Sequence, residues 1–299
     1  MRKRMLFVFN PKAGTGKIKN SLLDIVDIFN KGGYEVIIYA TQSSRDAYEK
    51  AKEYEDKVDL IVCSGGDGTL DEVVTGIMEK GSQVPIGYIP AGSTNDFANS
   101  LFMPKNMAEV ASMIMEEELY RCDIGKFNSQ TFAYIAAFGL FTDVSYATDQ
   151  DLKNILGHVA YLLEGMKQLK DVRSFHMKVE SEELTVENDF IFGMVSNSRS
   201  VGGFKHLTGK NVDMDDGLFE VTLITFPKNP VELSEIVTSM LTAEDNTDLI
   251  YSFKSSRLTF YSDEEVPWTL DGEFGGSHTQ VEIKNCHQAL NLYLKSTKK

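Results

Sequence analysis

Residues 60–69 read LIVCSGGDGT, an apolar run that passes directly into a glycine-rich loop. The run from Leu60 to Cys63 is apolar on both faces, as in a strand buried inside a parallel sheet. A helical pattern starts near Thr69 and continues through apolar residues to Met78, and Gly81 ends it. A strand that leads through glycines into a helix is typical of a parallel α/β domain, in which ligands bind outside the carboxyl ends of the strands.

The loop from Gly65 to Thr69 combines the features of a phosphate-binding turn with one carboxylate. Glycines let backbone N–H groups approach phosphate oxygens closely, and the helix N-terminus adds partial positive charge. Because a carboxylate does not favour bare phosphate, we expect Asp67 to hold Mg²⁺ on nucleotide phosphates. The alternative is an ordinary turn in which Asp67 caps the helix.

Strand and helix patterns alternate on both sides of this loop. Strands are predicted at residues 5–9, 34–40, 60–63 and 84–89, and helices over 22–29, 70–78 and 107–115. The order predicts a parallel sheet covered by helices on both faces.

Two further polar loops follow strands at the same edge of this sheet. The loop from Asn10 to Lys17 carries glycines, a hydroxyl and lysines, although its spacing is not that of a Gly-x-x-x-x-Gly-Lys-[Ser/Thr] P-loop. The loop from Pro90 to Asp96 follows the fourth strand and, taken alone, is typical of a helix cap. Together the three loops favour one nucleotide site.

The second half of the chain has a different pattern. Apolar and polar residues alternate with period two at 175–180, 218–223, 257–261 and 279–283, which indicates antiparallel sheet. Helical patterns interrupt the alternation at 152–166 and 233–241. We therefore expect an α/β fold, with a nucleotide-binding domain over residues 1–121 and a mainly antiparallel β domain over residues 122–286.

Composition narrows the class of protein. The chain has 299 residues and a formal net charge of −14, which argues against a general nucleic-acid binder. Three scattered cysteines fit a reducing cytoplasm, and neither a membrane span nor a signal peptide is predicted. Residues 1–20 are basic and carry no acid, which fits either a solvated segment or a phosphate-attracting surface.

Five strings resemble the diacylglycerol kinase catalytic-domain family of lipid kinases, which includes bacterial soluble diacylglycerol kinases and, more distantly, sphingosine and ceramide kinases. They are Asn10-Pro11-Lys12-Ala13-Gly14, Gly65-Gly66-Asp67-Gly68-Thr69 with Glu72, Gly92-Ser93-Thr94-Asn95-Asp96-Phe97-Ala98, Asp215-Asp216-Gly217-Leu218 and Leu270-Asp271-Gly272-Glu273. The strings span nearly the whole chain in the family's order. The Gly-Gly-Asp-Gly-Thr string alone is shared with NAD kinases and resembles a phosphofructokinase motif.

The resemblance implies that the first domain binds ATP, that residues 287–299 return to it, and that the second domain is a β-sandwich. The implied ATP-binding residues are Asn10, Pro11, Lys12, Ala13, Gly14, Lys17, Thr41, Gly65, Gly66, Gly68, Thr69, Glu72, Ser93, Thr94, Asn95 and Asp96. At Ser93 the family usually has threonine, and the substitution keeps the hydroxyl.

The resemblance also implies a Mg²⁺ site at Asp216, with main-chain oxygens of Asp213 and Leu218. Read without the family, this acidic turn is typical of a solvated surface. The family's general base lies in Asp-Gly-Glu, so we expect Asp271 to be the base, with Glu273 as a helper or as the alternative base. A plain β-turn is the other interpretation of this segment.

These observations predict an ATP- and Mg²⁺-dependent kinase that phosphorylates a lipid hydroxyl, with diacylglycerol as acceptor and phosphatidic acid as product. A kinase of a soluble acceptor such as NAD, and a non-catalytic regulator that binds lipid or nucleotide, are the alternatives. We expect a cytoplasmic protein that contacts the membrane weakly and reversibly, aided by Arg2, Lys3 and Arg4. A homodimer is compatible with the sequence.

Three residues outside these motifs carry further expectations. Trp268 is expected to serve packing, and His176 is expected to be exposed on the polar face of a strand. His206 follows a glycine pair and is a weaker candidate for a ligand site. The apolar residues between Phe132 and Phe141 are expected to form core, with a part available to line an acyl-chain groove.

Overall fold

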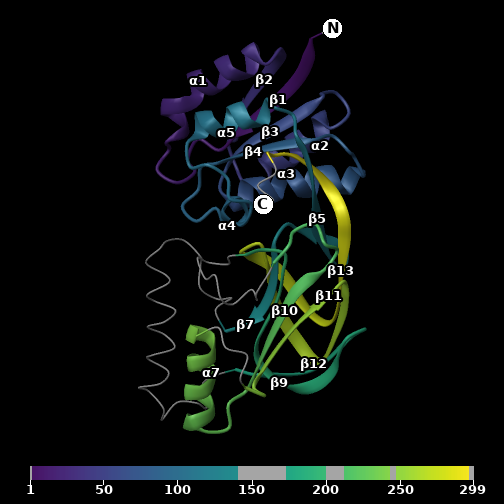
Figure 1. Cartoon of the computed structure of the whole chain (residues 1–299). Coiled ribbons are helices and arrows are strands. Elements are labelled where there is room, and N and C mark those ends of the chain that lie inside the picture. The colour runs from purple at the N-terminus through teal and green to yellow at the C-terminus, as the bar shows by residue number, and fades with distance from the viewer. Residues whose placement is uncertain (1, 141–172, 200–211, 243–246, 296–299) are drawn as a thin grey trace. The chain divides into compact units, whose positions relative to one another are not determined.

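The computed structural model describes residues 2–140, 173–199, 212–242 and 247–295. The chain forms two compact units, one of residues 1–124 and 288–299 and one of residues 125–287. The elements in Figure 1 are β1 (Lys3–Phe9), α1 (Ile18–Lys31), β2 (Tyr34–Ala40), α2 (Asp46–Tyr54), β3 (Leu60–Gly65), α3 (Asp67–Lys80), β4 (Ile86–Pro90), α4 (Asp96–Ser100), α5 (Met107–Ile114), β5 (Leu119–Phe127), β6 (Gln130–Phe132), β7 (Ile135–Gly139), β8 (Phe175–Ser181), β9 (Thr185–Ser196), β10 (Phe219–Thr225), α7 (Pro230–Thr242), β11 (Ile250–Ser255), β12 (Arg257–Leu270) and β13 (Glu273–Tyr293).

The first unit is built on a parallel sheet with the strand order β2-β1-β3-β4. The end of β13 joins this sheet, where Leu292 pairs in parallel with Ile86 of β4. Every residue of β3 is buried, as its continuous apolar run predicts. Helix α1 packs against α5 and α2 packs against α3, and these two pairs flank the sheet on opposite faces (Figure 1). The prediction of a parallel sheet with helices on both faces is confirmed.

The predicted elements of this unit are present with small shifts at their ends. Helix α3 begins at Asp67, two residues before the predicted start, and β4 begins at Ile86, two residues after it. Two short helices, α2 and α4, were not predicted. The sequence of α2, DAYEKAKEY, has few large apolar residues, and α4 has only five residues. Neither helix is therefore long or apolar enough to show a clear helical period.

The second unit is rich in antiparallel strands. Strands β11, β10, β9, β7, β12 and β13 are neighbours in that order, and β8 pairs with both β9 and β12. In β8 the buried residues Phe175, Met177 and Val179 alternate with the exposed residues His176 and Lys178. In β8 the period-two pattern of the sequence is thus the pattern of burial, whereas every residue of β10 is buried, so the alternation at 218–223 does not describe burial there.

One aromatic cluster fills the core of this unit. The ring of Trp268 lies 5.1 Å from that of Phe127, 4.8 Å from that of Phe138 and 5.1 Å from that of Phe260, measured between centroids. Burial of one such large side chain contributes about 1.5–3 kcal/mol to folding. Trp268 therefore serves packing, as expected, and Phe132 also belongs to this core. The predicted helix at 152–166, Phe141 and His206 lie outside the described residues.

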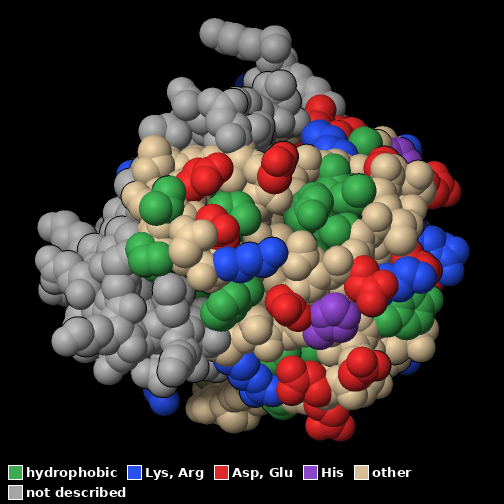
Figure 2. Space-filling model, turned by 90° about the horizontal axis from the view of Figure 1, so that it is seen from below, with side chains coloured by type: hydrophobic (Ala, Val, Ile, Leu, Met, Phe, Trp, Pro, Cys, Tyr) green, Lys and Arg blue, Asp and Glu red, His purple; other side chains and the backbone are tan. Residues whose placement is uncertain are grey.

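The face seen in Figure 2 carries acidic and basic side chains close together, and its apolar side chains lie in several separate groups. Within the described ranges, no helix is long and apolar enough to cross a membrane.

Candidate functional site

The three polar loops predicted from the sequence come together at the carboxyl ends of β1, β3 and β4. The backbone N–H of Asn10 donates to the carbonyl of Ser64 at 2.8 Å, and that of Ala91 donates to the carbonyl of Gly65 at 2.8 Å. These two hydrogen bonds tie the first and third loops to the end of β3. The structure therefore brings the glycine-rich loops to one edge of the sheet, where ligands bind in parallel α/β domains.

Glycine is required at two places where these loops touch. Gly14 has a φ of 54°, and a β-carbon there would lie 2.5 Å from the carbonyl oxygen of Ala91. A β-carbon on Gly92 would lie 2.6 Å from the Cα atom of Gly66. Because real side chains do not tolerate such distances, only glycine lets the three loops approach this closely.

The carboxylate of Asp67 lies where the second and third loops meet. Its Oδ2 atom accepts a hydrogen bond from the backbone N–H of Asp96 at 3.2 Å, and its Oδ1 atom accepts one from Phe97 at 3.4 Å. The residue before α3 is Gly66, which has no side chain to cap the helix, and Asp67 is the first residue of α3. The side chain of Asp67 instead holds the start of α4.

Asn95 fixes the shape of the third loop. It has a φ of 54°, its Oδ1 atom accepts from the N–H of Gly92 at 2.9 Å, and its Nδ2 atom donates to the carbonyl of Gly92 at 2.8 Å. The hydroxyl of Tyr88 lies within hydrogen-bonding distance of two acceptors, the carbonyl oxygen of Gly65 at 3.2 Å and Asn95 Oδ1 at 3.4 Å. Burial, aided by the charge of Asp67, raises the pKa of Tyr88 well above its usual value, so the hydroxyl keeps its proton and remains a donor.

Glu72 has a structural task that the sequence did not reveal. Its carboxylate accepts hydrogen bonds from the backbone N–H of Arg45 at 2.7 Å and of Ala47 at 3.0 Å. These donors lie at the start of α2, so Glu72 caps that helix from a distance of 27 residues in the sequence. Local capping patterns cannot find such a partner, because they compare neighbouring residues only.

The remaining candidates for ATP contact differ in exposure. Exposed are Lys12, Gly14, Lys17, Gly68 and Ser93. Partly buried are Asn10, Pro11, Thr41, Gly66, Asp67, Glu72, Thr94 and Asn95, and buried are Ala13, Gly65, Thr69 and Asp96. Thr41 stands at the end of β2, where its N–H donates to the carbonyl of Phe9 at 2.9 Å. Phosphate contacts from the exposed lysines and hydroxyls are thus sterically open, whereas the buried members can contribute only through the backbone or through packing.

In the second unit, Asp271 and Gly272 form a two-residue turn between β12 and β13. Their φ values are 50° and 87°, and Leu270 pairs with Glu273 across the turn. Positive φ at both central residues is the requirement of a type I′ hairpin turn, for which Asp-Gly is a favoured sequence. The β-turn that the sequence suggested as an alternative is therefore present.

The turn nevertheless places the Asp271 carboxylate in a specific environment. The side chain is 6% exposed and accepts three backbone hydrogen bonds: from Ala133 at 2.5 Å, Tyr134 at 3.0 Å and Ile135 at 2.9 Å. Such donors stabilise the charged carboxylate and hold it in one orientation. The turn and a chemical role are thus compatible. Glu273 and Phe274, the next residues of the hairpin, are exposed.

The acidic turn before β10 presents one carboxylate that is already in contact with a cation. Asp216 Oδ1 accepts from the N–H of Leu218 at 2.9 Å, and Asp216 Oδ2 lies 3.0 Å from Lys254 Nζ. In the part of the chain that the structure describes, no group of three His, Cys, Asp or Glu side chains could hold a metal. A Mg²⁺ ion would thus depend on Asp216 and main-chain oxygens. Such hard oxygen donors suit Mg²⁺, although the ammonium of Lys254 contacts one oxygen of this carboxylate.

The same lysine contacts a buried acid that sequence reasoning missed. Lys254 Nζ lies 3.0 Å from Oε1 of Glu220, a residue that is 4% exposed. Burial raises the pKa of Glu220 to about 7, against the opposing effect of the lysine. Burial disfavours the charged form of Lys254, but its hydrogen bonds to Asp216 and Glu220 outweigh this and raise its pKa.

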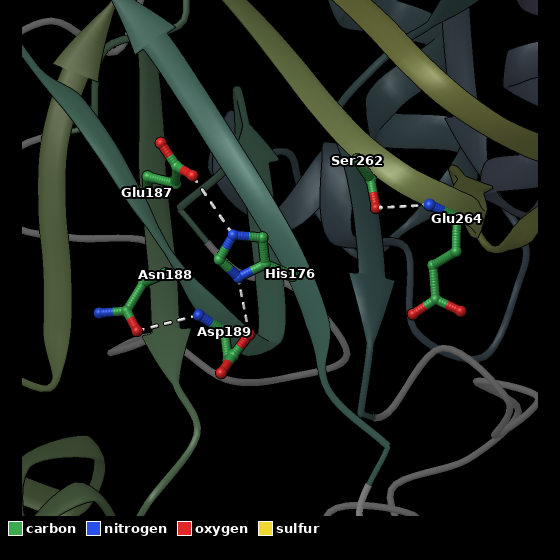
Figure 3. Close-up of polar contacts among 6 residues, drawn as sticks. All are labelled: His176, Glu187, Asn188, Asp189, Ser262 and Glu264. Carbon is green, nitrogen blue, oxygen red and sulfur yellow. Dashed lines mark hydrogen bonds and ion pairs between the residues drawn. The ribbon is translucent and has the colours of Figure 1, made fainter.

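His176 is exposed on β8, as the sequence predicts, and lies between two acids of β9 (Figure 3). Its Nδ1 atom lies 2.9 Å from Asp189 Oδ1, and its Nε2 atom lies 3.3 Å from Glu187 Oε1. The hydrogen bond to Asp189, followed by that to Glu187, raises the pKa of His176. The two acids engage opposite nitrogens of the ring, which is the arrangement of a charged imidazolium rather than of a metal ligand set.

Comparison with known proteins places this geometry in a family. The model of the diacylglycerol kinase catalytic domain matches residues 4–127. A protein of Staphylococcus saprophyticus named diacylglycerol kinase is 34% identical over 279 residues, which cover 92% of this chain and 90% of that protein. A protein of Staphylococcus carnosus with the same name is 33% identical over 98% of this chain and 95% of its own length. The chain belongs to the diacylglycerol kinase family.

A solved structure supports this assignment at the level of the fold. The crystal structure of a Bacillus anthracis (strain Sterne) protein, provisionally named a diacylglycerol kinase, matches 98% of this chain and 98% of its own. The TM-score is 0.81 at 26% sequence identity. The mixed α/β fold with a sheet-rich C-terminal part is thus shared with that protein.

Proposed function

We propose that this protein transfers the γ-phosphate of ATP to a hydroxyl of diacylglycerol and so produces phosphatidic acid. The observation that carries the proposal is the convergence of the three glycine-bearing loops at one sheet edge, in a chain whose full-length relatives are named diacylglycerol kinase. The proposal places the protein in lipid metabolism.

In this proposal the predicted domain of residues 1–121 with 287–299 binds ATP. The glycines at the strand ends allow backbone N–H groups to approach the phosphates, and the N-terminus of α3 adds partial positive charge. Lys12 and Lys17 are exposed beside these glycines and carry the charge that phosphate oxygens need. Asp67 lies at the meeting point of the loops and is the candidate for contact with the metal ion on the phosphates.

The predicted domain of residues 122–286, which the family resemblance describes as a β-sandwich, supplies the acceptor side. The lipid hydroxyl attacks the γ-phosphorus in line, the new oxygen–phosphorus bond forms as the bond to the β-phosphate oxygen breaks, and ADP leaves. The proposed base, Asp271, accepts the hydroxyl proton. Backbone N–H donors hold its carboxylate in one orientation, which suits a transfer that depends mainly on positioning. Glu273 is the alternative base.

A Mg²⁺ ion is held in this proposal by Asp216 together with main-chain oxygens of Asp213 and Leu218. When bound, Mg²⁺ would neutralise the charge of the Asp216 carboxylate and draw the main-chain oxygens of this turn toward it. The residues themselves hold the turn before β10, where the Asp216 side chain receives the N–H of Leu218.

Contact with the membrane is proposed to be weak and transient. Of the basic residues near the start of the chain, Lys3 makes an ion pair with Glu117 at 2.6 Å, and Arg4 lies 3.8 Å from Glu35. Each pair offsets a charge that would otherwise attract an anionic surface, so little net attraction remains from this segment. A homodimer is compatible with the proposal and is not required by it.

The test is transfer of labelled γ-phosphate from ATP, with Mg²⁺, to lipids in mixed micelles. The acceptors are diacylglycerol, monoacylglycerol, ceramide, sphingosine and a polyprenol, with NAD as the soluble acceptor and Asp271→Asn as the inactive control. Label in phosphatidic acid that is lost in the variant supports the proposal. Label only in NADP would identify a kinase of a soluble acceptor, and ATP binding without transfer to any acceptor would identify a regulator.

A further inference from the structure

Lys254 forms a bridge between two carboxylates in the second unit. Its Nζ atom lies 3.0 Å from Asp216 Oδ2 and 3.0 Å from Glu220 Oε1. The side chains are 32% exposed at Lys254, 27% at Asp216 and 5% at Glu220. The lysine thus joins a partly exposed acid to a buried one.

The strand register determines this contact. Glu220 of β10 and Lys254 of β11 are directly opposite each other in an antiparallel pair, so their side chains leave the sheet on the same face. Among the described residues, Glu220 Oε2 has no hydrogen-bond partner. A buried carboxylate without other donors is costly unless a cation accompanies it, so Glu220 holds the ammonium of Lys254 beside it.

The same ammonium also contacts one of the two carboxylate oxygens of Asp216. That oxygen belongs to the carboxylate that the proposed function assigns to Mg²⁺. A divalent cation that approaches Asp216 must either displace the ammonium or bind against its positive charge.

We propose that Lys254, which Asp216 and Glu220 hold jointly, sets the affinity of the Asp216 site for Mg²⁺. This inference rests on the Mg²⁺ site of the proposed function. When Glu220 is replaced by neutral glutamine, removal of Lys254 strengthens Mg²⁺ binding, since the competing positive charge is gone. One unit charge at this range in a partly exposed site corresponds to roughly a tenfold change in affinity.

The experiment compares Mg²⁺ binding to the full chain without nucleotide, by titration calorimetry and by the Mg²⁺-dependent shift of the melting temperature. The decisive pair is Glu220→Gln and the double variant Glu220→Gln with Lys254→Met, because the two differ only at Lys254. The double variant also avoids a buried charge without a partner and so is expected to fold. Lys178→Met is the matched control, since Lys178 is a surface lysine of the same unit paired with Glu180 at 2.6 Å.

We expect the double variant to bind Mg²⁺ about tenfold more tightly than Glu220→Gln, and Lys178→Met to bind like the wild type. Equal or weaker binding in the double variant overturns the inference. Asp216→Asn must abolish the response, and Mg²⁺ binding that survives this substitution also overturns it.

Phosphate transfer to diacylglycerol by the wild type is measured separately. Transfer with no effect of Lys254 on Mg²⁺ binding would reject this inference and leave the proposed function standing. If Lys254 affects Mg²⁺ binding but the wild type transfers no phosphate to diacylglycerol, the role of Lys254 is supported and the proposed function is rejected.

Discussion

Gly92 approaches Gly66 so closely that a β-carbon on Gly92 would lie 2.6 Å from the Cα atom of Gly66 and 2.8 Å from Asn95 Oδ1. The two glycines belong to the loops after β4 and β3. Their contact, together with the hydrogen bond from Ala91 to Gly65, holds the two proposed phosphate-binding loops against each other. The absence of side chains at these positions is therefore a condition for the shape of the site.

Substitution of Gly92 by alanine is predicted to separate the loops. Because backbone atoms cannot yield as a flexible side chain can, we expect a loss of about 1–3 kcal/mol in the free energy of unfolding. ATP binding should weaken by at least roughly tenfold, since a displacement of the loops misplaces several phosphate contacts together. Urea denaturation and calorimetric titration with ATP measure the two effects.

Gly66→Ala is the matched control for stability. A β-carbon on Gly66 would lie 3.5 Å from Gly92 Cα, an ordinary van der Waals distance. We expect this variant to unfold at a urea concentration close to that of the wild type. An equal loss of stability in both variants would contradict the steric argument.

The sequence could predict those features of the fold that depend on residues close together in the chain. The run LIVCSGGDGT contains both a strand and the start of a helix, so one segment was enough to predict the parallel sheet and its ligand edge. The alternation of Phe175, Met177 and Val179 likewise predicted a half-buried strand, because burial follows the two-residue period directly.

Contacts between distant residues could not be predicted in this way. Lys254 and Glu220 meet because β10 and β11 pair in one particular register. The alternation at 218–223 put Glu220 on the polar face of its strand, but the structure buries this residue. Asp271 combines a feature that the local sequence predicts with one that it does not. Its Asp-Gly dipeptide predicted a turn, while the burial of its carboxylate depends on amides 136 to 138 residues away.

Glu72 allows its structural task to be separated from a role in ATP binding. Glu72→Ala removes the acceptor for the N–H groups of Arg45 and Ala47, so we expect a loss of about 0.5–2 kcal/mol in the free energy of unfolding. If capping is the whole role, the affinity for ATP is unchanged under conditions where the variant is folded. Hydrogen exchange should show the increase in amide exchange confined to α2. A large loss of ATP affinity with unchanged stability would instead assign Glu72 to the nucleotide.

The two candidate bases are predicted to respond differently to loss of charge. Asp271→Asn replaces one acceptor oxygen by an NH₂ group that faces backbone N–H donors, so it should lower both phosphate transfer and the free energy of unfolding, the latter by about 1–3 kcal/mol. Glu273→Gln alters an exposed side chain and should leave stability unchanged.

Single-turnover phosphate transfer with bound ATP then distinguishes the bases. If Asp271 is the base, Asp271→Asn retains ATP binding but transfers at least about a hundredfold more slowly, and Glu273→Gln changes the rate far less. If Glu273→Gln causes the larger loss, the proton is accepted by Glu273, and Asp271 serves to shape the hairpin.

His176 is predicted to make the stability of the second unit depend on pH. Its pKa is raised above the ordinary value of 6.5, with Asp189 as the main cause and Glu187 as the second. Because the folded state binds the proton more tightly than the unfolded chain, the stabilising contribution is fully present below pH 6.5 and is lost as the pH rises through the raised pKa. NMR titration of the imidazole measures this pKa directly. Asp189→Asn should lower it more than Glu187→Gln does, and His176→Gln should remove the corresponding part of the pH dependence of unfolding. A titration midpoint at or below 6.5 in the wild type would show that the two ion pairs in Figure 3 do not hold the proton in solution.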